Sequence, residues 1–192
     1  MIVLASKSAS RQAMLTAAGV SFDARPAHLD ERALETGLGD ADPATVALAL
    51  AQAKALAVSE TARLVLGSDS LVSCDGRRFD KPASVEEAAE HLRWFSGRAM
   101  DLHSAAALAR DGQIVWSGAA VARLHVRPLS ERFISLYLAA EWPEVSHCVG
   151  VFRLEAMGVQ LFDRIDGDSF TVLGMPLLQV LAALRDLGEI AA

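Results

Sequence analysis

Residues 2–19 read IVLASKSASRQAMLTAAG. The apolar run from Ile2 to Ala5 is typical of a short buried strand, and the small polar residues after it lead into a helix predicted over 12–18. Gly19 directly follows this helix, at the position where a glycine commonly ends one. A buried strand that passes through a polar loop into a helix is characteristic of α/β proteins.

The rest of the chain mixes helices and strands in the same way. Periodicity and capping signals predict further helices over 42–59, 84–95, 130–140 and 177–187. They predict strands over 20–24, 64–66, 71–74, 100–109, 113–126, 150–154, 159–165 and 170–173. Asp111-Gly112 predicts a hairpin turn between the two longest strands, and the acidic stretch 28–42 is predicted to be a loop. Together these elements predict an α/β protein with a mixed sheet.

Composition and charge exclude several classes of protein. The chain has 192 residues, of which 52% are hydrophobic and 22% charged, so it is neither a disordered tail nor a solvating acidic segment. A formal net charge of −6 disfavours a nucleic-acid binder, and no apolar run is long enough for a signal peptide or a membrane span. Two cysteines are too few for a disulfide framework. We therefore expect one domain over residues 1–192 in a reducing cytoplasm, with no nucleic-acid or membrane partner.

Polar residues at two strand ends are candidates for chemistry. Ser6, Ser8 and Arg11 lie where the first strand passes into its helix. The free amides of a helix start attract an anion, and serine hydroxyls and an arginine add further donors. A capping serine beside an exposed arginine explains the same residues without a ligand. Asp69 follows an apolar run, where a carboxylate can orient water or hold a metal; an ordinary turn aspartate is the alternative.

Three further charged residues complete the candidate set. Glu31 can supply a second carboxylate for a magnesium ion, which takes one or two carboxylates together with phosphate oxygens and water. Lys54 interrupts the most apolar helix, and Lys81 precedes Pro82, which stiffens its loop. Each lysine has a plain alternative, because a lysine can extend to water from an apolar helix or stand on the surface. The chain lacks the Gly-x-x-x-x-Gly-Lys phosphate loop, which disfavours a P-loop kinase or GTPase.

Several short segments of the chain, taken in their order along the sequence, resemble the Maf family of nucleotide pyrophosphatases, also called septum-formation-inhibitor Maf proteins. The matching segments are LASKSASR at 4–11, Asp30-Glu31, QAKA at 52–55, Gly67-Ser68-Asp69, Lys81-Pro82, Ser96-Gly97, IDGD at 165–168 and GMPL at 174–177. Each segment alone is a weak signal, whereas the ordered set spans nearly the whole chain and is specific. The resemblance implies a strongly twisted mixed sheet flanked by helices, in two lobes around a central cleft as in inosine triphosphatases, and a cytoplasmic homodimer.

The resemblance also implies an activity and a set of roles. Maf proteins hydrolyse nucleoside triphosphates between the α and β phosphates with a divalent cation, here Mg²⁺ or Mn²⁺. The roles carried over by position are substrate binding for Ser6, Ser8, Arg11, Lys54 and Lys81, metal binding for Glu31 and Asp69, and general base catalysis for Asp69. These residues suit the reaction, because the protein catalyses phosphoryl transfer mostly by positioning the reactants and stabilising charge.

This chain departs from the family pattern in an informative way. Many relatives carry Pro-Arg where it has Ala9-Ser10, so the phosphate grip is expected to fall more heavily on Arg11, and Met100 replaces a usual histidine. At Glu155 the chain is similar to the 7-methyl-GTP branch, whereas the dTTP and UTP branch tends to carry glutamine. A carboxylate accepts from the two N–H donors of guanine and attracts a methylated, positive ring, while glutamine both donates and accepts, as uracil and thymine require. A solvated Glu155, or one paired with Arg153, is the alternative.

The main hypothesis is therefore a pyrophosphatase of modified or non-standard nucleotides, 7-methyl-GTP among them. The alternatives are a dTTP and UTP pyrophosphatase, a hydrolase of inosine or xanthosine triphosphate, and a regulatory protein that acts on cell division through protein contacts. A panel of nucleotides separates the enzymes from one another, and catalytic silence of the metal-loaded protein favours the regulatory protein.

Overall fold

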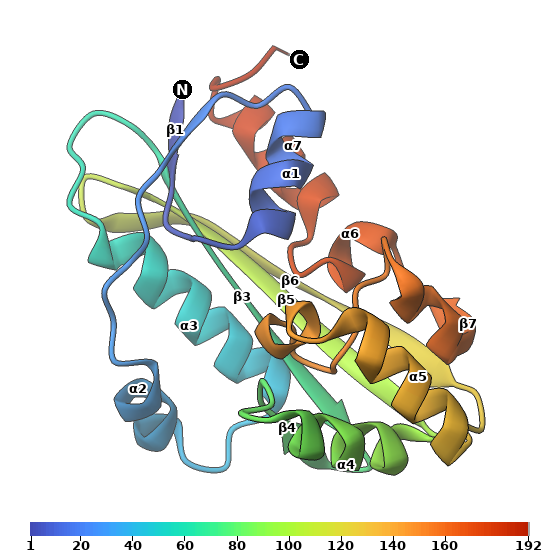
Figure 1. Ribbon diagram of the computed structural model, residues 1–192. Coiled ribbons are helices and arrows are strands. Elements are labelled where there is room, and N and C mark those ends of the chain that lie inside the picture. The colour runs from blue at the N-terminus through green and yellow to red at the C-terminus, as the bar shows by residue number, and fades with distance from the viewer. Residues whose placement is uncertain (192) are drawn as a thin grey trace. The chain divides into compact units, whose positions relative to one another are not determined.

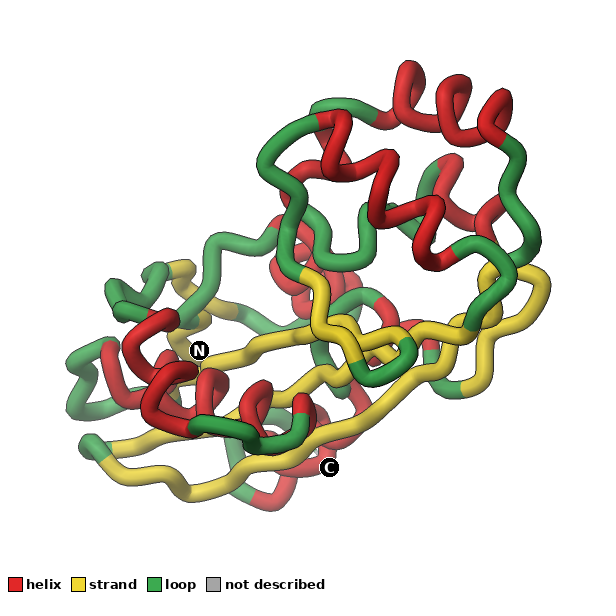
Figure 2. Tube along the Cα trace, turned by 90° about the horizontal axis from the view of Figure 1, so that it is seen from below, coloured by secondary structure: helices red, strands yellow, loops and turns green. Residues whose placement is uncertain are grey.

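The protein is a mixed α/β protein in which helices and strands are joined by short loops (Figures 1 and 2). The computed structural model describes residues 1–191, and over these residues the hydrogen-bonded strand order is β2-β1-β3-β5-β6-β7, with β4 beside β3. The strands are β1 (Ile2–Leu4), β2 (Phe22–Ala24), β3 (Val65–Cys74), β4 (Arg77–Phe79), β5 (Ala99–Arg110), β6 (Gln113–Val126) and β7 (Phe162–Asp166). The helices are α1 (Ala9–Ala17), α2 (Glu31–Leu38), α3 (Pro43–Ala57), α4 (Val85–Phe95), α5 (Glu131–Glu141), α6 (Ser169–Val172) and α7 (Leu177–Asp186), with the 3-10 helices η1 (Glu144–His147) and η2 (Met157–Leu161). The predicted mixed sheet is confirmed.

The pairing of β1 with its neighbours creates a strand end suited to a site. β1 pairs in parallel with both β2 and β3, whereas β4 and β7 pair antiparallel with β3 and β6. The register sets Leu4 opposite Leu66, so β1 ends while β3 continues, and residues 68–70 lie past the carboxyl end of β1. Ligand sites of α/β proteins form outside such strand ends.

The chain divides into two compact units, which we describe one at a time. The first comprises 1–70, 103–121 and the described chain from Ser169 onward; the second comprises 71–102 and 122–168. Each of the long strands β3, β5 and β6 contributes residues to both units. No helix in the described part of the chain is long and apolar enough to cross a membrane.

The core of the first unit gathers around β1. All three residues of this strand are buried, which explains its uninterrupted apolar sequence. The buried side chains that pack with it come from α1, from β3 and the residue before it, and from β5 and α7, and include Met14, Leu15, Leu64, Leu66, Leu108, Val180 and Leu184. This core fixes the point at which β1 turns into α1.

A glycine brings helix α3 unusually close to strand β3. A Cβ atom at Gly67 would lie 2.2 Å from the carbonyl oxygen of Ala51 and 2.4 Å from the backbone nitrogen of Ala55. Only glycine therefore fits at this point of the sheet. Lys54 lies on the same turn of α3, and Asp69, two residues after Gly67, projects to the same face of β3. The close approach thus brings Lys54 and Asp69 together.

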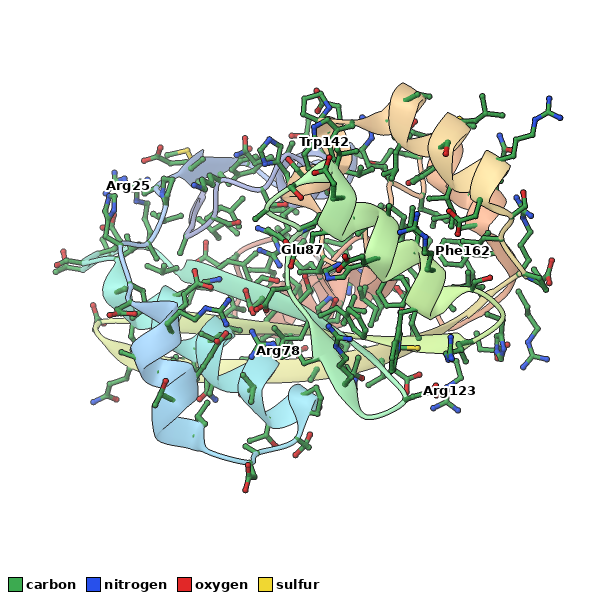
Figure 3. All side chains as sticks on the ribbon, turned by 60° about the horizontal axis from the view of Figure 1, so that its bottom comes forward. Arg25, Arg78, Glu87, Arg123, Trp142 and Phe162 are labelled. Carbon is green, nitrogen blue, oxygen red and sulfur yellow. The ribbon has the colours of Figure 1, made fainter. Side chains whose placement is uncertain are left out.

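The second unit contains helices α4 and α5, and local signals in its sequence are confirmed. Ser84 caps α4 by accepting a hydrogen bond from the amide of Glu87 at 3.2 Å. The carboxylate of Glu87, labelled in Figure 3, accepts from the amide of Ala83 at 2.7 Å, so the serine half of the predicted capping box is confirmed, while the glutamate reaches the residue before the cap. The ring of Phe79 packs edge-on against His91 and Phe95, with centroid distances of 5.0 and 4.6 Å. The predicted helix over 84–95 is therefore stabilised both at its start and along its buried face.

One predicted loop is wrong. Within 28–42 the structure forms helix α2, because the side chain of Asp30 accepts a hydrogen bond from the amide of Ala33 at 3.0 Å and caps the helix. Glu31, one of the acidic residues that suggested a loop, stands in the first turn, where its charge complements the helix dipole. Gly39, with a φ of 57°, ends the helix instead of preventing it.

Three predicted strands near the carboxyl end are wholly or partly wrong. The segment 150–154 is irregular, because Gly150 and Val151 both have positive φ values, 82° and 58°, which an extended strand does not allow. The segment 159–165 is strand only in its second part, as β7, after the 3-10 helix η2. The segment 170–173 lies mostly in the short helix α6. Apolar runs of this length do not separate strand from helix.

Candidate functional site

The loop from β1 into α1 forms the first part of the candidate site. The hydroxyl oxygen of Ser8 caps α1 by accepting from the amide of Arg11 at 3.4 Å. Ser6 lies two residues earlier in the loop, and its hydroxyl oxygen accepts from the amide of Ser8 at 3.2 Å. These serines hold the loop against the start of a nine-residue helix, where backbone N–H groups favour an anion. The predicted strand-loop-helix arrangement is confirmed.

Arg11 is buried, and each nitrogen of its guanidinium donates a hydrogen bond to the protein. The alternative in which an exposed arginine merely follows a capping serine is therefore wrong. Only 8% of the residue is exposed. Its guanidinium donates from Nε to the carbonyl of Gly174 at 3.0 Å, from Nη1 to the hydroxyl of Ser6 at 3.3 Å, and from Nη2 to the hydroxyl of Ser70 at 3.3 Å. Burial lowers the pKa of Arg11, and the nearby carboxylates of Asp69 and Glu31 oppose that shift. An arginine remains charged even so, which leaves a fixed positive charge at the strand end.

A cluster of two carboxylates around one ammonium forms the second part. The Nζ of Lys54 lies 2.6 Å from Oδ1 of Asp69 and 3.1 Å from Oε1 of Glu31. Asp69 comes from β3, Lys54 from α3, and Glu31 from the first residue of α2. The side chains of Lys54 and Asp69 are 13% and 11% exposed, whereas that of Glu31 is 47% exposed. Segments far apart in sequence therefore place opposite charges in contact at one partly buried point.

The donor atoms of this cluster suit a hard divalent cation. Two carboxylate oxygens already converge on a single positive charge, and oxygen ligands are those that Mg²⁺ and Mn²⁺ prefer. Over the described chain, no group of three or more histidine, cysteine, aspartate or glutamate residues could hold a metal ion. An ion at Glu31 and Asp69 would thus complete its coordination with substrate oxygens and water, as Mg²⁺ commonly does.

The residues that hold the guanidinium of Arg11, Gly174 and Ser70, and Ser68, which donates to Gly174, were not predicted from the sequence. The hydroxyl of Ser68, which is fully buried, donates to the carbonyls of Ala105 at 2.8 Å and Gly174 at 3.2 Å. Gly174 has a φ of 97°, and a Cβ there would meet the hydroxyl of Ser70 at 3.2 Å. The alternation of a strand was the available signal, because Ser68 and Ser70 share one face of β3 while Asp69 projects from the other.

Two predicted residues, Lys81 and Glu155, belong to the second unit. Both are exposed; Lys81 follows β4, and Glu155 stands in the turn before η2. Arg153 forms its ion pair with Glu141, at 2.9 Å, rather than with Glu155. The alternative that pairs Glu155 with Arg153 therefore loses its support, and the roles of Lys81 and Glu155 in binding stay predictions.

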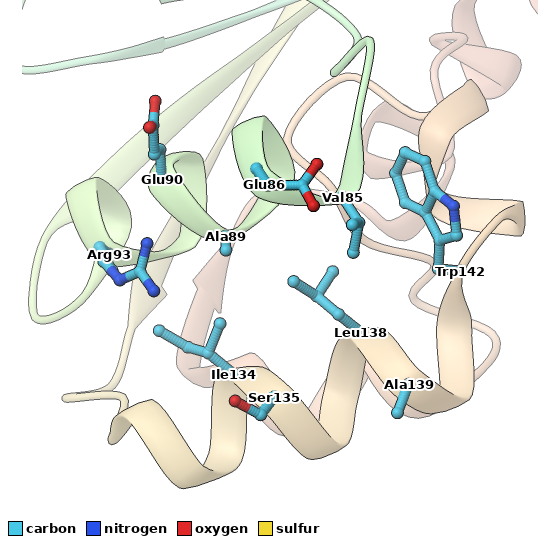
Figure 4. Close-up of a pocket in the computed structure, with 10 residues that line it drawn as sticks. All are labelled: Val85, Glu86, Ala89, Glu90, Arg93, Ile134, Ser135, Leu138, Ala139 and Trp142. Carbon is cyan, nitrogen blue, oxygen red and sulfur yellow. The ribbon is translucent and has the colours of Figure 1, made fainter.

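A pocket of about 570 Å³ opens between α4 and α5 of the second unit (Figure 4). Ile134 contributes to its apolar wall, and Glu86 and Glu90 carry negative charge at its edge. Arg93 forms a bidentate ion pair with Glu131, with both distances at 2.9 Å. Two carboxylates beside a neutralised arginine do not suit a polyphosphate, and no residue predicted from the sequence lines this pocket.

Comparisons with known proteins agree with the sequence resemblance. The family model described as "Maf-like protein" matches residues 1–187. The chain is 48% identical over 196 residues to a 7-methyl-GTP pyrophosphatase from Rhizobium meliloti, an alignment that covers 100% of this chain and 98% of the relative. It is also 48% identical over 189 residues to a nucleoside triphosphate pyrophosphatase from Nitrobacter hamburgensis, covering 97% and 94% of the two chains.

Solved structures resemble the fold more loosely. A nucleoside-triphosphatase/dITP/XTP pyrophosphatase from Mycobacterium abscessus superposes with a TM-score of 0.45 and 16% identity, covering 97% of each chain. The sequence relatives are therefore the ones that define the family.

Proposed function

The chain belongs to the Maf family, whose model matches nearly its whole length, and from this premise we propose that it is a nucleoside triphosphate pyrophosphatase. In the proposed reaction, water attacks the α phosphorus of a nucleoside triphosphate, and the α–β anhydride breaks to give a nucleoside monophosphate and pyrophosphate. The contact of Lys54 with Asp69 and Glu31, formed past the carboxyl end of β1, is the observation that carries the proposal.

Asp69 is the proposed general base. Its carboxylate stands past the carboxyl end of β1 and accepts a hydrogen bond from Lys54, and its side chain is 11% exposed. A carboxylate held in this way can orient an attacking water and accept its proton while the nucleophile forms its bond to phosphorus. Gly67 fixes the backbone of β3 two residues away against α3, so that the base is positioned by a tightly packed strand.

The residues that would hold the triphosphate are positive or carry hydrogen-bond donors. The hydroxyls of Ser6 and Ser8 and the amides at the start of α1 offer donors to phosphate oxygens. Lys54 supplies a mobile positive charge, and Arg11 supplies a fixed one through its buried guanidinium. Lys81 is proposed as the second phosphate-binding lysine on the basis of the family motif.

A divalent cation, Mg²⁺ or Mn²⁺, is proposed as the cofactor. Glu31 and Asp69 would hold it, since their carboxylate oxygens approach one point in the structure. When bound, such an ion neutralises charge on the phosphates and makes a bound water more acidic. We further propose that the enzyme works as a homodimer in the cytoplasm, without nucleic-acid or membrane partners.

7-methyl-GTP is the proposed substrate among modified nucleotides. Glu155 is exposed and accepts only, which matches the N–H donors and positive charge of a methylated guanine. Two of the similar relatives are named 7-methyl-GTP pyrophosphatases, from Rhizobium meliloti and Mesorhizobium japonicum. A dTTP and UTP pyrophosphatase, and a hydrolase of inosine or xanthosine triphosphate, remain the competing enzymes.

Release of pyrophosphate from a panel of nucleotides tests the proposal. The panel comprises 7-methyl-GTP, GTP, UTP, dTTP, ITP and XTP, each with Mg²⁺, Mn²⁺ or a chelator. We expect the highest kcat/KM with 7-methyl-GTP and none with the chelator. Asp69→Asn should lose at least about 100-fold in kcat while it stays folded, and the exposed Asp40 supplies the control Asp40→Asn, which should keep full activity.

Two results would contradict the proposal. Full activity of Asp69→Asn would remove the assignment of the general base. A folded wild-type protein that released no pyrophosphate from any nucleotide with either metal would remove the enzyme, and would favour a regulatory protein that acts on cell division.

A further inference from the structure

Lys54 stands where the two proposed metal ligands meet. Its Nζ is within 3.1 Å of Oε1 of Glu31 and within 2.6 Å of Oδ1 of Asp69. The side chains of Lys54 and Asp69 are 13% and 11% exposed, so little water screens the contact between these two. A divalent cation bound by the same two oxygens would occupy nearly the same point as the ammonium.

The charges around this point already balance. Glu31 and Asp69 bring two negative charges, Lys54 brings one positive charge, and the nearby buried guanidinium of Arg11 brings another. A divalent ion that approaches the two carboxylates meets the ammonium of Lys54 in direct contact with both of them, and like charges in a partly buried site repel strongly. The ammonium therefore reduces the attraction that the two carboxylates alone would exert on the ion.

A polyphosphate changes this balance. A nucleoside triphosphate carries about four negative charges, which compete with the carboxylates for the ammonium. The backbone of α3 is pinned against Gly67 by Ala51 and Ala55, whereas the long side chain of Lys54 has four rotatable bonds. The ammonium can therefore turn from the carboxylates to a phosphate without movement of the helix, and it leaves both carboxylates to the metal.

We propose that Lys54 occupies the cation position of this site and excludes a divalent ion until a polyphosphate takes the ammonium. Metal and nucleotide consequently enter together, as one complex. The identity of the polyphosphate rests on the proposed function, whereas the exclusion of metal by Lys54 rests on the contacts with Glu31 and Asp69 alone.

Titration of the nucleotide-free protein with Mn²⁺, followed by the electron paramagnetic resonance signal of the free ion, tests the exclusion. Lys54→Met and the shorter, hydrogen-bonding Lys54→Gln each remove the ammonium. We expect both variants to bind one Mn²⁺ at least about tenfold more tightly than the wild type, because the ion no longer competes with the ammonium. A tenfold change in affinity corresponds to about 1.4 kcal/mol. Adding Asp69→Asn to Lys54→Met should abolish the gain, which assigns the tighter ion to this site.

Arg185→Met is the matched control. It removes one positive charge from an exposed residue in the last turn of α7 that forms no part of the cluster, and should leave the Mn²⁺ affinity within about twofold of the wild type. Folded Lys54 variants that bind Mn²⁺ no more tightly than the wild type would overturn the proposal, as would an equal gain in Arg185→Met. Pyrophosphate release is measured separately, so a tighter ion in Lys54→Met without any wild-type turnover would refute the enzyme and retain the exclusion.

Discussion

Substitution of Gly67 by alanine should damage stability and activity together. The added Cβ would lie 2.2 Å from the carbonyl oxygen of Ala51, and a contact needs at least 3.0 Å, so α3 has to withdraw by about 0.8 Å. The obstructing atoms belong to the backbone of α3, which cannot rotate away. We expect a loss of about 3 kcal/mol in the free energy of unfolding, or about 6–12 °C in Tm for a chain of this length.

The same withdrawal moves Lys54 away from Asp69, because the lysine stands between Ala51 and Ala55 on the displaced helix. A misplacement of about 1 Å in a catalytic group can cost about 100-fold, and we expect kcat/KM of Gly67→Ala to fall by that order. Urea unfolding, far-UV circular dichroism and pyrophosphate release, measured on one preparation, give both effects.

Gly37→Ala is the matched control for this prediction. Gly37 lies inside α2 with no atom within 4 Å of an added Cβ and without a positive φ. Alanine there should leave activity unchanged and raise the free energy of unfolding by about 0.5–1 kcal/mol, because glycine is the poorer helix former. A Gly67→Ala protein as stable and as active as Gly37→Ala would refute the argument that this close approach positions the site.

Three other predictions each concern one side chain or one pair of side chains. Arg11→Lys and Ser6→Ala should each lower kcat/KM by at least about tenfold. Because Arg11 donates to Ser6, the double variant should have a kcat/KM no lower than that of the less active single variant. If the two losses multiply in the double variant, the two residues act independently. Burial lowers the pKa of His91 below its ordinary 6.5, so the native protein binds fewer protons than the unfolded chain as the pH falls through 6.5, and stability is lost in that range. The urea midpoint of His91→Gln should therefore change less between pH 7.5 and 5.5 than that of the wild type, and an equal change would contradict this. Glu155→Gln should shift kcat/KM from 7-methyl-GTP toward UTP and dTTP by about tenfold, and an unaltered ratio would exclude Glu155 from base recognition.

Elements with local signals could be predicted from the sequence. Asp42 and Pro43 open α3 as expected, with the carboxylate of Asp42 accepting from the amides of Ala44 and Thr45. The hairpin turn at Asp111-Gly112 is also confirmed, with φ values of 50° and 73° at its two central residues. Caps and tight turns depend on residues a few positions apart, so a sequence contains all that determines them.

The wrongly predicted segments depend on distant or conflicting signals. Asp30 caps α2 in the structure, whereas the acidic residues and glycines of the same stretch predict a loop. The short apolar run at 170–173 fits a strand as well as a helix, and hydrogen bonds such as that from the hydroxyl of Ser104 to the carbonyl of Thr171 tie it to β5. Tertiary packing decides such segments, and local propensity does not.

The candidate site divides in the same way. Ser6, Arg11, Lys54 and Asp69 could be named from their residue types and order, and the structure places all four in the first unit. The burial of Arg11 could not be predicted, because it depends on a carbonyl at Gly174, 163 residues away. The sequence suggested that Arg11 grips phosphate, whereas in the structure its nitrogens donate to the protein itself.

The position at which water enters the products tests the central claim most directly. A single turnover of 7-methyl-GTP in ¹⁸O-labelled water, with Mg²⁺, can be analysed by mass spectrometry of both products. Attack on the α phosphorus, assisted by Asp69, predicts one ¹⁸O atom in the nucleoside monophosphate and none in the pyrophosphate. Label in the pyrophosphate, or formation of a nucleoside diphosphate and orthophosphate, would contradict the account.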